Sequence, residues 1–330
     1  MTGIAIVGRG AMGTRHARAL ASLGRAADIR YVVARSPGPP LEAAPTALVI
    51  DDFNRVLRDD AVDVVAICTP TGTHRQLAVQ ALRAGKNVLL EKPIALTMAD
   101  AREIAQEAHR AEGIVMVAHV VRFFEGYRLV RRDVAAGLLG EVLSARATRL
   151  SSAPDWADWL RNDAESGGML VDFGIHDCDQ VNLLLGRPLE VSAVQAVPGG
   201  PVESTIRYEG GRVGQVLSFS GLAPQVPFRS SIEIVGSHGV ARYEFVAASH
   251  DRAEVSRYSL STGDTAVSLD LAPEDPYATQ YEYFLQCVAT HAQPVECTTP
   301  EAIDALQVAL AATRSRDSRR PVRVESHTSN

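Results

Sequence analysis

Cysteine is scarce in this chain, and its spacing has no disulfide or metal pattern. The 330 residues include four cysteines, Cys68, Cys178, Cys287 and Cys297, and no two of them form a Cys-x-x-Cys pair. Disulfide frameworks and cysteine-ligated zinc sites use characteristic close spacings, so the sequence argues against both. Three of the four lie in apolar segments, where a thiol acts as a small buried hydrophobe. We therefore expect a reduced protein in the cytosol.

Long apolar runs and an excess of basic charge are also missing. No apolar run approaches the roughly 20 residues that cross a bilayer, so we expect no membrane partner. The chain has 39 acidic and 33 basic side chains, a formal net charge of −6. Nucleic-acid binding favours a basic surface, and this balance therefore argues against a nucleic-acid partner.

The first 120 residues alternate short apolar runs with helix-like segments. A hydrophobic fraction of 46% in a chain of this length predicts about two globular domains. Strand-like runs occur at Ile4–Val7, Ile29–Ala34, Ala47–Ile50, Val62–Cys68, Asn87–Leu90 and Ile114–Ala118. Alternation of this kind is typical of a doubly wound parallel sheet, which we place in a first domain over residues 1–120.

Strand patterns dominate the second part of the chain, residues 121–330. The runs are Val142–Leu150, Leu189–Val197, Val202–Tyr208, Val213–Phe219, Ser231–Val235 and Val240–Phe245, with helices expected at about Met169–Leu185, Tyr277–Thr290 and Pro300–Thr313. Tight turns between the runs predict an α+β domain with a mostly antiparallel sheet of about six strands. Helices mainly on one side leave an open face, and exposed apolar faces commonly become interfaces. We expect a homodimer or homotetramer through Val213–Phe245.

A glycine-rich loop, Gly8-Arg9-Gly10-Ala11-Met12-Gly13, follows the first strand. In such a loop the first glycine allows a tight turn, the second lets the backbone approach a pyrophosphate, and the third lets the helix pack on the strand. Amides at the start of the next helix then hold the phosphate charge. The loop predicts a Rossmann domain that binds NAD or NADP.

The end of the second strand bears on the choice between these cofactors. An NAD-preferring site places Asp or Glu roughly 20 residues after the loop, where it binds the ribose 2′-hydroxyl. Here the run Tyr31–Ser36 has no acid and ends in Arg35 and Ser36. Positive charge from Arg35, assisted by Arg9, suits a 2′-phosphate and favours NADP. The alternative is that Arg35 stacks on the adenine while NAD binds.

A lysine stands at the end of the fifth strand, in Glu91-Lys92-Pro93. Ligands of open α/β sheets bind beyond the carboxyl ends of the strands. An ammonium there can bind a substrate hydroxyl and stabilise developing alkoxide charge. The loop Thr69-Pro70-Thr71 and His74 follow the fourth strand, so they should border the cofactor, although His74 could instead cap or cover its helix.

Asp172, His176 and Asp179 are four and three residues apart in a predicted helix that follows Gly167-Gly168. That spacing places them on one helix face. A histidine titrates near neutrality and can take a proton from a hydroxyl group. A metal held by the histidine and two carboxylates is the alternative, but Lys92 already supplies an electrophile, so we expect no metal.

Together these residues resemble the Gfo/Idh/MocA family, named for glucose–fructose oxidoreductase and inositol dehydrogenase, over nearly the whole chain. The matching positions are the loop 8–13, Asp63-Val64-Val65, Thr69-Pro70, His74, Glu91-Lys92-Pro93, Arg122-Phe123, Gly140-Glu141-Val142, and Gly167-Gly168 through Asp172, His176 and Asp179. The resemblance implies a Rossmann domain and a C-terminal α/β domain whose open sheet often mediates oligomers.

The resemblance also implies roles for individual residues. Lys92 would bind substrate and cofactor, often with the following peptide bond cis, and Glu91, Pro93 and Arg122 would border the same cofactor. Asp172 and His176 would act as a pair with His176 as the proton carrier, and Asp179 would lie beside the substrate. Arg161 resembles a family arginine near the nicotinamide.

The sequence therefore predicts a cytosolic NAD(P)-dependent dehydrogenase or reductase that acts on CH–OH groups of a cyclic polyol, sugar or sugar derivative. His176 would remove the hydroxyl proton, Lys92 would stabilise the oxygen, and Asp172 would orient the pair. Two alternatives stay open. One is a glycosidase of the same fold that uses tightly bound NAD, and the other is a non-catalytic regulator that binds NAD(P) as a signal.

Overall fold

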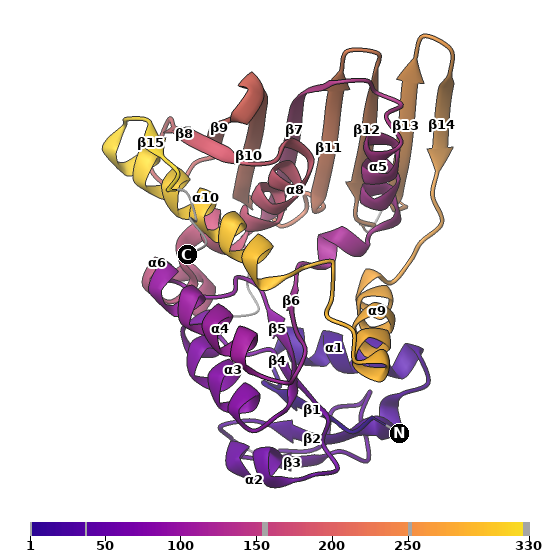
Figure 1. The fold of residues 1–330 in the computed structure, drawn as a ribbon, viewed down its shortest axis with the longest axis vertical. Coiled ribbons are helices and arrows are strands. Elements are labelled where there is room, and N and C mark those ends of the chain that lie inside the picture. Colours follow the sequence, from indigo (N-terminus) through magenta and orange to yellow (C-terminus); the bar gives the residue numbers. More distant parts are fainter. Residues whose placement is uncertain (1, 37, 154–157, 250–252, 326–330) are drawn as a thin grey trace. The chain divides into compact units, whose positions relative to one another are not determined.

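The chain folds into two units that alternate along the sequence (Figure 1). The computed structural model describes residues 2–36, 38–153, 158–249 and 253–325. Unit 1 comprises Met1–Phe123 and Asp275–Ile303, and unit 2 comprises Phe124–Glu274 and Asp304–Asn330. Within the described ranges, no helix is both long and apolar enough to cross a membrane.

Unit 1 is built on a sheet whose six described strands are all parallel, in the order β3-β2-β1-β4-β5-β6. The strands are β1 Ile4–Val7, β2 Ile29–Val33, β3 Leu48–Ile50, β4 Val64–Ile67, β5 Asn87–Glu91 and β6 Val115–Ala118. Every residue of β1, β4 and β6 is buried, as expected for parallel strands covered on both faces. The predicted doubly wound parallel sheet is confirmed.

The helices of unit 1 begin at recognisable caps. They are α1 Ala11–Ser22, α2 Phe53–Arg58, α3 His74–Arg83, α4 Met98–Arg110 and α9 Pro276–Thr290, with 3-10 turns at Ala26–Asp28, Thr71–Thr73 and Val120–Phe123. The Thr97 hydroxyl accepts the N–H of Asp100 at 3.1 Å and so caps α4. Asp275 caps α9, and Pro276 occupies its first turn.

Helix α9 completes the core of unit 1, although it lies far along the chain. Its Tyr281 and Phe284 are fully buried, in one cluster with Ile6 and Val64 of the sheet. In Figure 1, α9 runs beside α1, and the two helices are in contact. The sequence order of the elements does not reveal this pairing.

Unit 2 contains a sheet of nine described strands in the order β14-β13-β12-β11-β7-β10-β9-β8-β15. They are β7 Val142–Ser152, β8 Pro188–Gln195, β9 Val202–Tyr208, β10 Val213–Leu222, β11 Arg229–Gly236, β12 Gly239–Val246, β13 Val255–Thr262, β14 Ala266–Asp270 and β15 Val322–Arg323. Strands β7 and β10 pair in parallel, and the other neighbours are antiparallel. The predicted mostly antiparallel sheet is confirmed.

The prediction of about six strands was wrong, because three strands at the sheet edges were missed. Strands β13 and β14 carry many serines and other polar side chains, and β15 has two residues. Edge strands need few apolar residues, since much of their surface faces solvent. Their sequences therefore resemble loops, and pairing of β13 with β12, β14 with β13 and β15 with β8 makes them strands.

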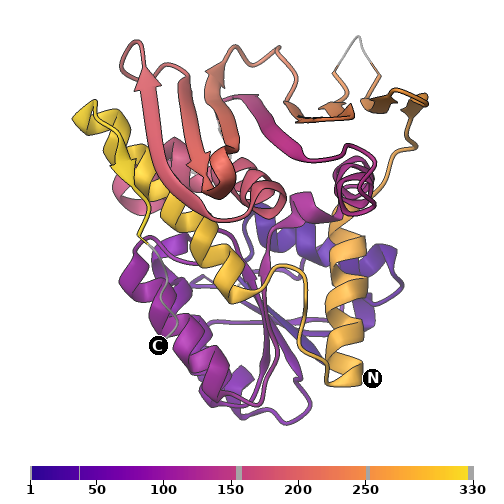
Figure 2. The ribbon, with the colours of Figure 1, turned by 45° about the horizontal axis from the view of Figure 1, so that its top comes forward.

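Helices lie on one face of this sheet. Helix α5, Glu125–Ala135, contacts β12 and β13, while α8, Ile175–Leu185, contacts β7 and β10 (Figure 2). The remaining helices are α6 Asp163–Ser166, α7 Gly168–Asp172 and α10 Thr299–Ser318, with 3-10 turns at Asp158–Arg161 and Glu209–Gly211. Helix α10 begins in unit 1 and continues into unit 2.

The opposite sheet face is largely polar, which corrects the expectation of an apolar face. Exposed residues alternate with buried ones along β9, so that Glu203, Thr205 and Arg207 share one face. In the centre of the sheet, Arg146 donates two hydrogen bonds, of 2.9 and 2.7 Å, to Gln215. Cross-strand polar pairs of this kind make the open face polar.

Candidate active site

The glycine loop after β1 has the backbone geometry of a dinucleotide loop. Gly8 has a φ of +104°, and a Cβ there would lie 2.6 Å from the carbonyl oxygen of Cys68. A Cβ at Gly13 would overlap the carbonyl oxygen of Gly8. A Cβ at Gly10 would meet nothing within 4 Å. Gly8 and Gly13 therefore allow the tight turn and the close helix, and Gly10 leaves the space that a pyrophosphate requires.

Positive charge surrounds the loop that follows β2. Arg35 and Ser36 come directly after the strand and are exposed. Arg9, in the glycine loop, donates a hydrogen bond of 2.9 Å from Nη2 to the carbonyl oxygen of Pro39. The structure thus brings the Arg9 side chain to the segment after Arg35, where the sequence predicts the 2′ substituent of the adenosine ribose.

The Glu91-Lys92-Pro93 turn lies where β5 ends. Glu91 is 4% exposed; its Oε1 lies 2.8 Å from Nε2 of His16, and its Oε2 accepts the N–H of Lys92 at 3.1 Å. The peptide bond between Lys92 and Pro93 is cis, as the resemblance predicts. Lys92 is half-buried, so its side chain begins in protein and retains access to solvent.

His74 connects this turn to the loop that follows β4. The ring is fully buried; Nδ1 lies 2.9 Å from the carbonyl oxygen of Pro93, and Nε2 lies 3.0 Å from that of Thr69. Burial lowers the pKa of His74, although the two carbonyls oppose that shift. Both ring nitrogens thus face protein carbonyls, and His74 joins the loop Thr69–Thr71 to the lysine turn. Ligand contact by His74 stays a prediction.

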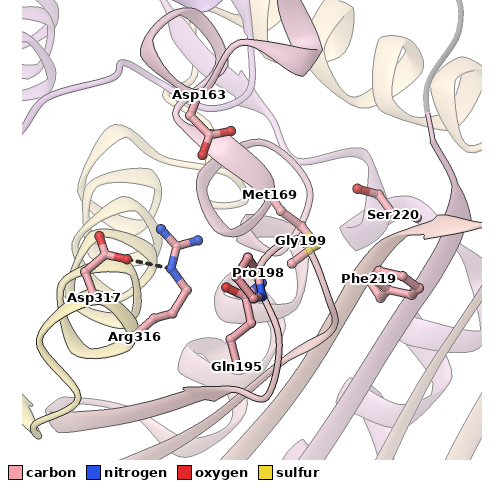
Figure 3. A pocket seen from close by; sticks show the side chains of 10 residues that line it. Asp163, Met169, Gln195, Pro198, Gly199, Phe219, Ser220, Arg316 and Asp317 are labelled. Carbon is pink, nitrogen blue, oxygen red and sulfur yellow. Dashed lines mark hydrogen bonds and ion pairs between the residues drawn. The ribbon is translucent and has the colours of Figure 1, made fainter.

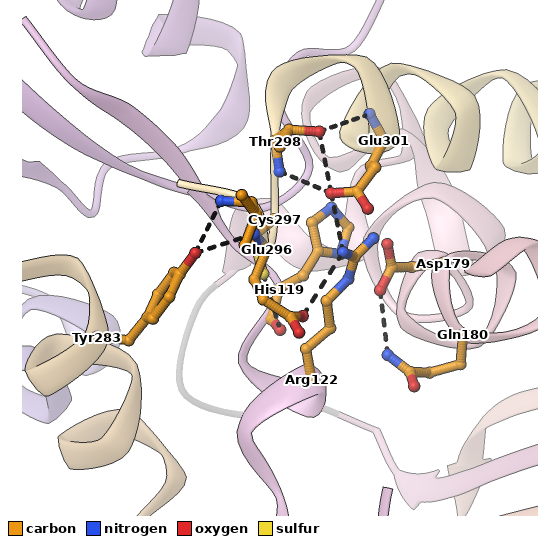
Figure 4. A network of polar contacts seen from close by, with 10 residues as sticks. His119, Arg122, Asp179, Gln180, Tyr283, Glu296, Cys297, Thr298 and Glu301 are labelled. Carbon is orange, nitrogen blue, oxygen red and sulfur yellow. Dashed lines mark hydrogen bonds and ion pairs between the residues drawn. The ribbon is translucent and has the colours of Figure 1, made fainter. Parts of the chain in front are cut away.

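The buried Arg122 pairs with two partly exposed acids of unit 1 (Figure 4). Its Nη1 lies 2.9 Å from Oε2 of Glu301 and 4.0 Å from Oε2 of Glu296. The Tyr283 hydroxyl accepts the N–H groups of Val295 and Glu296, which fixes the segment that carries these acids. The guanidinium is 2% exposed and pairs with acids of unit 1. Its predicted cofactor contact stays a prediction.

The predicted proton-transfer residues lie in unit 2, and the single helix predicted for them was wrong. Helix α7 ends at Asp172, and α8 begins at Ile175. At the break, the N–H of Gly174 donates to the carbonyl oxygen of Met169, five residues earlier. A Cβ at Gly174 would lie 2.8 Å from the Ser218 hydroxyl, so glycine allows this close approach.

The break changes which of these residues share a helix. His176 and Asp179 are three residues apart on α8, whereas Asp172 belongs to α7. Asp172 and His176 are half-buried, and Asp179 is 1% exposed. Oδ2 of Asp179 accepts a hydrogen bond of 3.1 Å from Nε2 of Gln180. Of the three predicted residues, His176 and Asp179 share a helix face, and Asp172 does not lie on that helix.

A buried ion pair anchors the first turn of α8. Arg149, on the inner face of β7, donates from Nε and Nη2 to the two carboxylate oxygens of Asp177, at 2.9 and 3.0 Å. Both residues are at most 4% exposed. The guanidinium also lies over the rings of Phe173 and Phe228. Because Asp177 follows His176 directly, this pair holds the backbone of the predicted proton carrier.

A pocket of about 340 Å³ lies elsewhere in unit 2 (Figure 3). It is lined by Asp163, Met169, Gln195, Pro198, Gly199, Phe219, Ser220, Gly221, Arg316 and Asp317. None of the predicted catalytic residues is among them. Arg316 donates to Asp317 at 2.8 Å, so the charges that face this pocket already compensate each other in part. The side chain of Arg161 lies outside the part of the chain that the structure describes.

Sequence reasoning missed a polar cluster directly behind the lysine turn. It consists of His16 on α1, Tyr281 on α9 and Cys68 after β4, together with Glu91. One signal was present, since His16 falls on the face of α1 that also carries Ala17 and Leu20. A histidine on a buried helix face needs a polar partner.

Two family models match the chain. Residues 2–119 match the family model described as oxidoreductase family, NAD-binding Rossmann fold, and residues 127–242 match the GFO/IDH/MocA C-terminal domain. The chain is 27% identical to a scyllo-inositol 2-dehydrogenase (NAD(+)) of Bacillus subtilis, over 97% of this chain and 96% of the relative. It is also 27% identical to an inositol 2-dehydrogenase of Rhizobium meliloti, over 97% and 98%.

A solved structure is similar over the same length. The crystal structure of GenD2 from gentamicin A biosynthesis, in complex with NAD, matches with a TM-score of 0.83 and 27% identity. The match covers 98% of this chain and 97% of that one.

Two glycine substitutions separate phosphate binding from folding. Gly10→Ala should change the free energy of unfolding by less than about 1 kcal/mol, because the added methyl group meets no protein atom. It should nevertheless weaken NAD(P)H binding, since the methyl group fills the expected pyrophosphate space. Gly13→Ala should destabilise the fold by about 1–3 kcal/mol through overlap with Gly8. Denaturant unfolding and cofactor fluorescence measure both. Unchanged affinity in Gly10→Ala would contradict the assignment.

Proposed function

The chain belongs to the Gfo/Idh/MocA family of oxidoreductases, and from that premise we propose that it is an NAD(P)-dependent dehydrogenase or reductase of a cyclic polyol or sugar. The observation that carries the proposal lies in unit 1. The parallel sheet brings the glycine loop after β1 and Lys92 after β5 to the same edge. A cofactor loop and a strand-end ammonium at one edge suit oxidation of an alcohol.

The substrate class rests on the relatives. Two of them, each similar over almost its full length, are named for dehydrogenation of scyllo-inositol and of inositol. A third, 27% identical over 81% of both chains, is a 1,5-anhydro-D-fructose reductase of Ensifer adhaerens. These substrates are rings that carry several hydroxyl groups, so we propose a substrate of that kind.

We assign the chemistry to three side chains. His176 accepts the proton of the reacting hydroxyl, and Asp172 orients the imidazole. The Lys92 ammonium donates a hydrogen bond to the oxygen as negative charge develops on it. When bound, the nicotinamide supplies the acceptor for the hydride that leaves the carbinol carbon. The oxygen then forms a carbonyl double bond with that carbon. In the reverse direction, His176 returns the proton.

We also propose the cytosol as the site of action. The four cysteines are buried and free in the structure. Free thiols suit a reducing compartment.

The roles proposed for His176, Asp172 and Lys92 predict a different kinetic defect for each substitution. His176→Ala should lower kcat by about 10²–10⁴-fold, the usual worth of general acid–base catalysis, while the Kd for NAD(P)H barely changes. Asp172→Asn should cost less, and Lys92→Ala should lower kcat and also weaken cofactor binding. The rising limb of the pH–rate profile for oxidation should vanish in His176→Ala. A panel of inositols and sugars, followed by NAD(P)H absorbance, measures these effects.

Exposed His109 on α4 gives a matched control, because His109→Ala should leave kcat unchanged. Wild-type turnover in His176→Ala would overturn the mechanism. It would favour the glycosidase or the regulator, neither of which requires net redox turnover.

We propose a preference for NADP over NAD. The exposed Arg35 and the nearby Arg9 supply positive charge, and no acid follows β2 directly. NADPH should bind about tenfold or more tightly than NADH, because a charged hydrogen bond contributes about 1.5–3 kcal/mol. Arg35→Ala should abolish that difference. Arg30→Ala, at the other end of β2, is the control and should keep it. Equal dissociation constants in the native protein would disprove the preference.

We propose a homodimer or homotetramer that forms through the open sheet face around Val213–Phe245. The polar character of that face is compatible with an interface, because interfaces as a whole are about as polar as other surfaces. Light scattering at micromolar concentration should give a dimeric or tetrameric mass. Arg146→Glu, in the centre of the face, should shift it towards the monomer. A monomeric mass for the native protein would refute the proposal.

A further inference from the structure

A buried polar cluster lies directly behind the lysine turn in unit 1. His16 and Tyr281 are fully buried, Glu91 is 4% exposed and Cys68 is 8% exposed. Nε2 of His16 lies 2.8 Å from Oε1 of Glu91, and Nδ1 lies 2.8 Å from the Tyr281 hydroxyl. The cluster therefore joins α1, β5 and α9 through one imidazole.

The charges in this cluster follow from its burial. Burial raises the pKa of Cys68, and it raises the pKa of Tyr281 to about 12, so both groups stay protonated at neutral pH. The remaining acidic group that faces the ring is the Glu91 carboxyl. Burial alone would lower the pKa of His16, but its contacts with Cys68, Tyr281 and Glu91 hold that pKa well above the ordinary value. A raised pKa favours the imidazolium form of His16 beside Glu91.

Other groups complete the surroundings of the ring. Tyr277 of α9 approaches His16 edge-on, with ring centroids 5.9 Å apart. Arg15 lies over the outer face of Tyr277, 4.8 Å from its centroid, and pairs with Asp275. The charge of Arg15 is compensated by Asp275, and the ring of Tyr277 separates it from His16.

Both carboxylate oxygens of Glu91 are in use. Oε1 contacts His16, and Oε2 accepts the backbone N–H of Lys92 at 3.1 Å. On the other side of the turn, Nδ1 of His74 lies 2.9 Å from the carbonyl oxygen of Pro93. Two buried histidines therefore hold the lysine turn, one on each side. Of the two, only His16 also lies on the helix that starts at the glycine loop.

We propose that His16 is a positioning residue: its contact with Glu91 holds the backbone of Lys92 and couples the phosphate-binding helix α1 to the lysine turn. The proposal rests on the function proposed for Lys92. His16 touches neither substrate nor reacting atoms in this scheme. It affects the reaction through Lys92, because the ammonium must be placed within a few tenths of an ångström of the position where it stabilises the developing charge.

The first test compares kinetics and binding. His16→Gln keeps a hydrogen-bond donor but loses the charge, so Glu91 is left with a weaker partner. We expect kcat to fall by about 10–100-fold, the effect of a small misplacement, with KM changed much less. Tyr281→Phe should give a smaller fall in kcat. Tyr31→Phe, which removes a hydrogen bond to Asp59 in the same unit, is the matched control and should leave kcat unchanged.

If His16 only stabilised the fold, the substitution would give a different result. His16→Gln would then lower Tm, while the folded enzyme, checked by circular dichroism at the assay temperature, would keep the native kcat. That outcome would overturn the proposal.

The second test needs no substrate, and so separates this proposal from the proposed function. Nuclear magnetic resonance of labelled histidine should show His16 as an imidazolium throughout pH 6–8, and Glu91→Gln should lower its pKa. Because the folded-state pKa is raised, the stabilisation from this charge is fully present below the unfolded pKa of about 6.5. It is lost as the pH rises through the folded pKa. The difference in Tm between native protein and His16→Gln should shrink accordingly. A neutral His16 at pH 6 would refute the pair.

Discussion

The parallel register of β1, β4 and β5 is the constraint on which the first unit depends. Val7 pairs with Ile67, and Ile67 pairs with Leu90, so the three strands end at the same level. Each strand delivers a different group at that level: the glycine loop, the segment Cys68–Thr71, and Glu91 with Lys92. Neighbouring strand ends therefore meet, and buried polar side chains behind them can share hydrogen bonds.

In both units, a buried charged group lies next in sequence to a candidate catalytic side chain. In unit 1, the Glu91 carboxylate precedes Lys92 and is bound by His16. In unit 2, the Asp177 carboxylate follows His176 and is bound by Arg149. A buried carboxylate without a partner is strongly unfavourable, so each partner restricts where the neighbouring backbone can lie. Lys92 and His176 are half-buried, while the charged groups next to them in sequence are buried.

Local patterns were sufficient for much of the fold. Apolar runs and glycines predicted every strand of the parallel sheet, because these signals depend on neighbours in sequence. Strands β13, β14 and β15, at or next to the sheet edges, were not predictable in this way, since their few apolar residues make strands only by pairing. The break between α7 and α8 was also missed, because the tight contact of Gly174 with Ser218 comes from a distant strand.

The sequence by itself determined the class of the protein, its glycine loop, and the identity of Lys92, Asp172 and His176 as candidates, since each stands in a motif with recognisable spacing. Only the tertiary structure decided what surrounds those residues. It shows that the buried side chains of His74 and Arg122 have protein partners, and that α9 joins the first unit although it lies far along the chain. It also shows that His16, Glu91 and Tyr281 form one cluster. These contacts join residues up to 265 positions apart, and no local pattern encodes a distance between such residues.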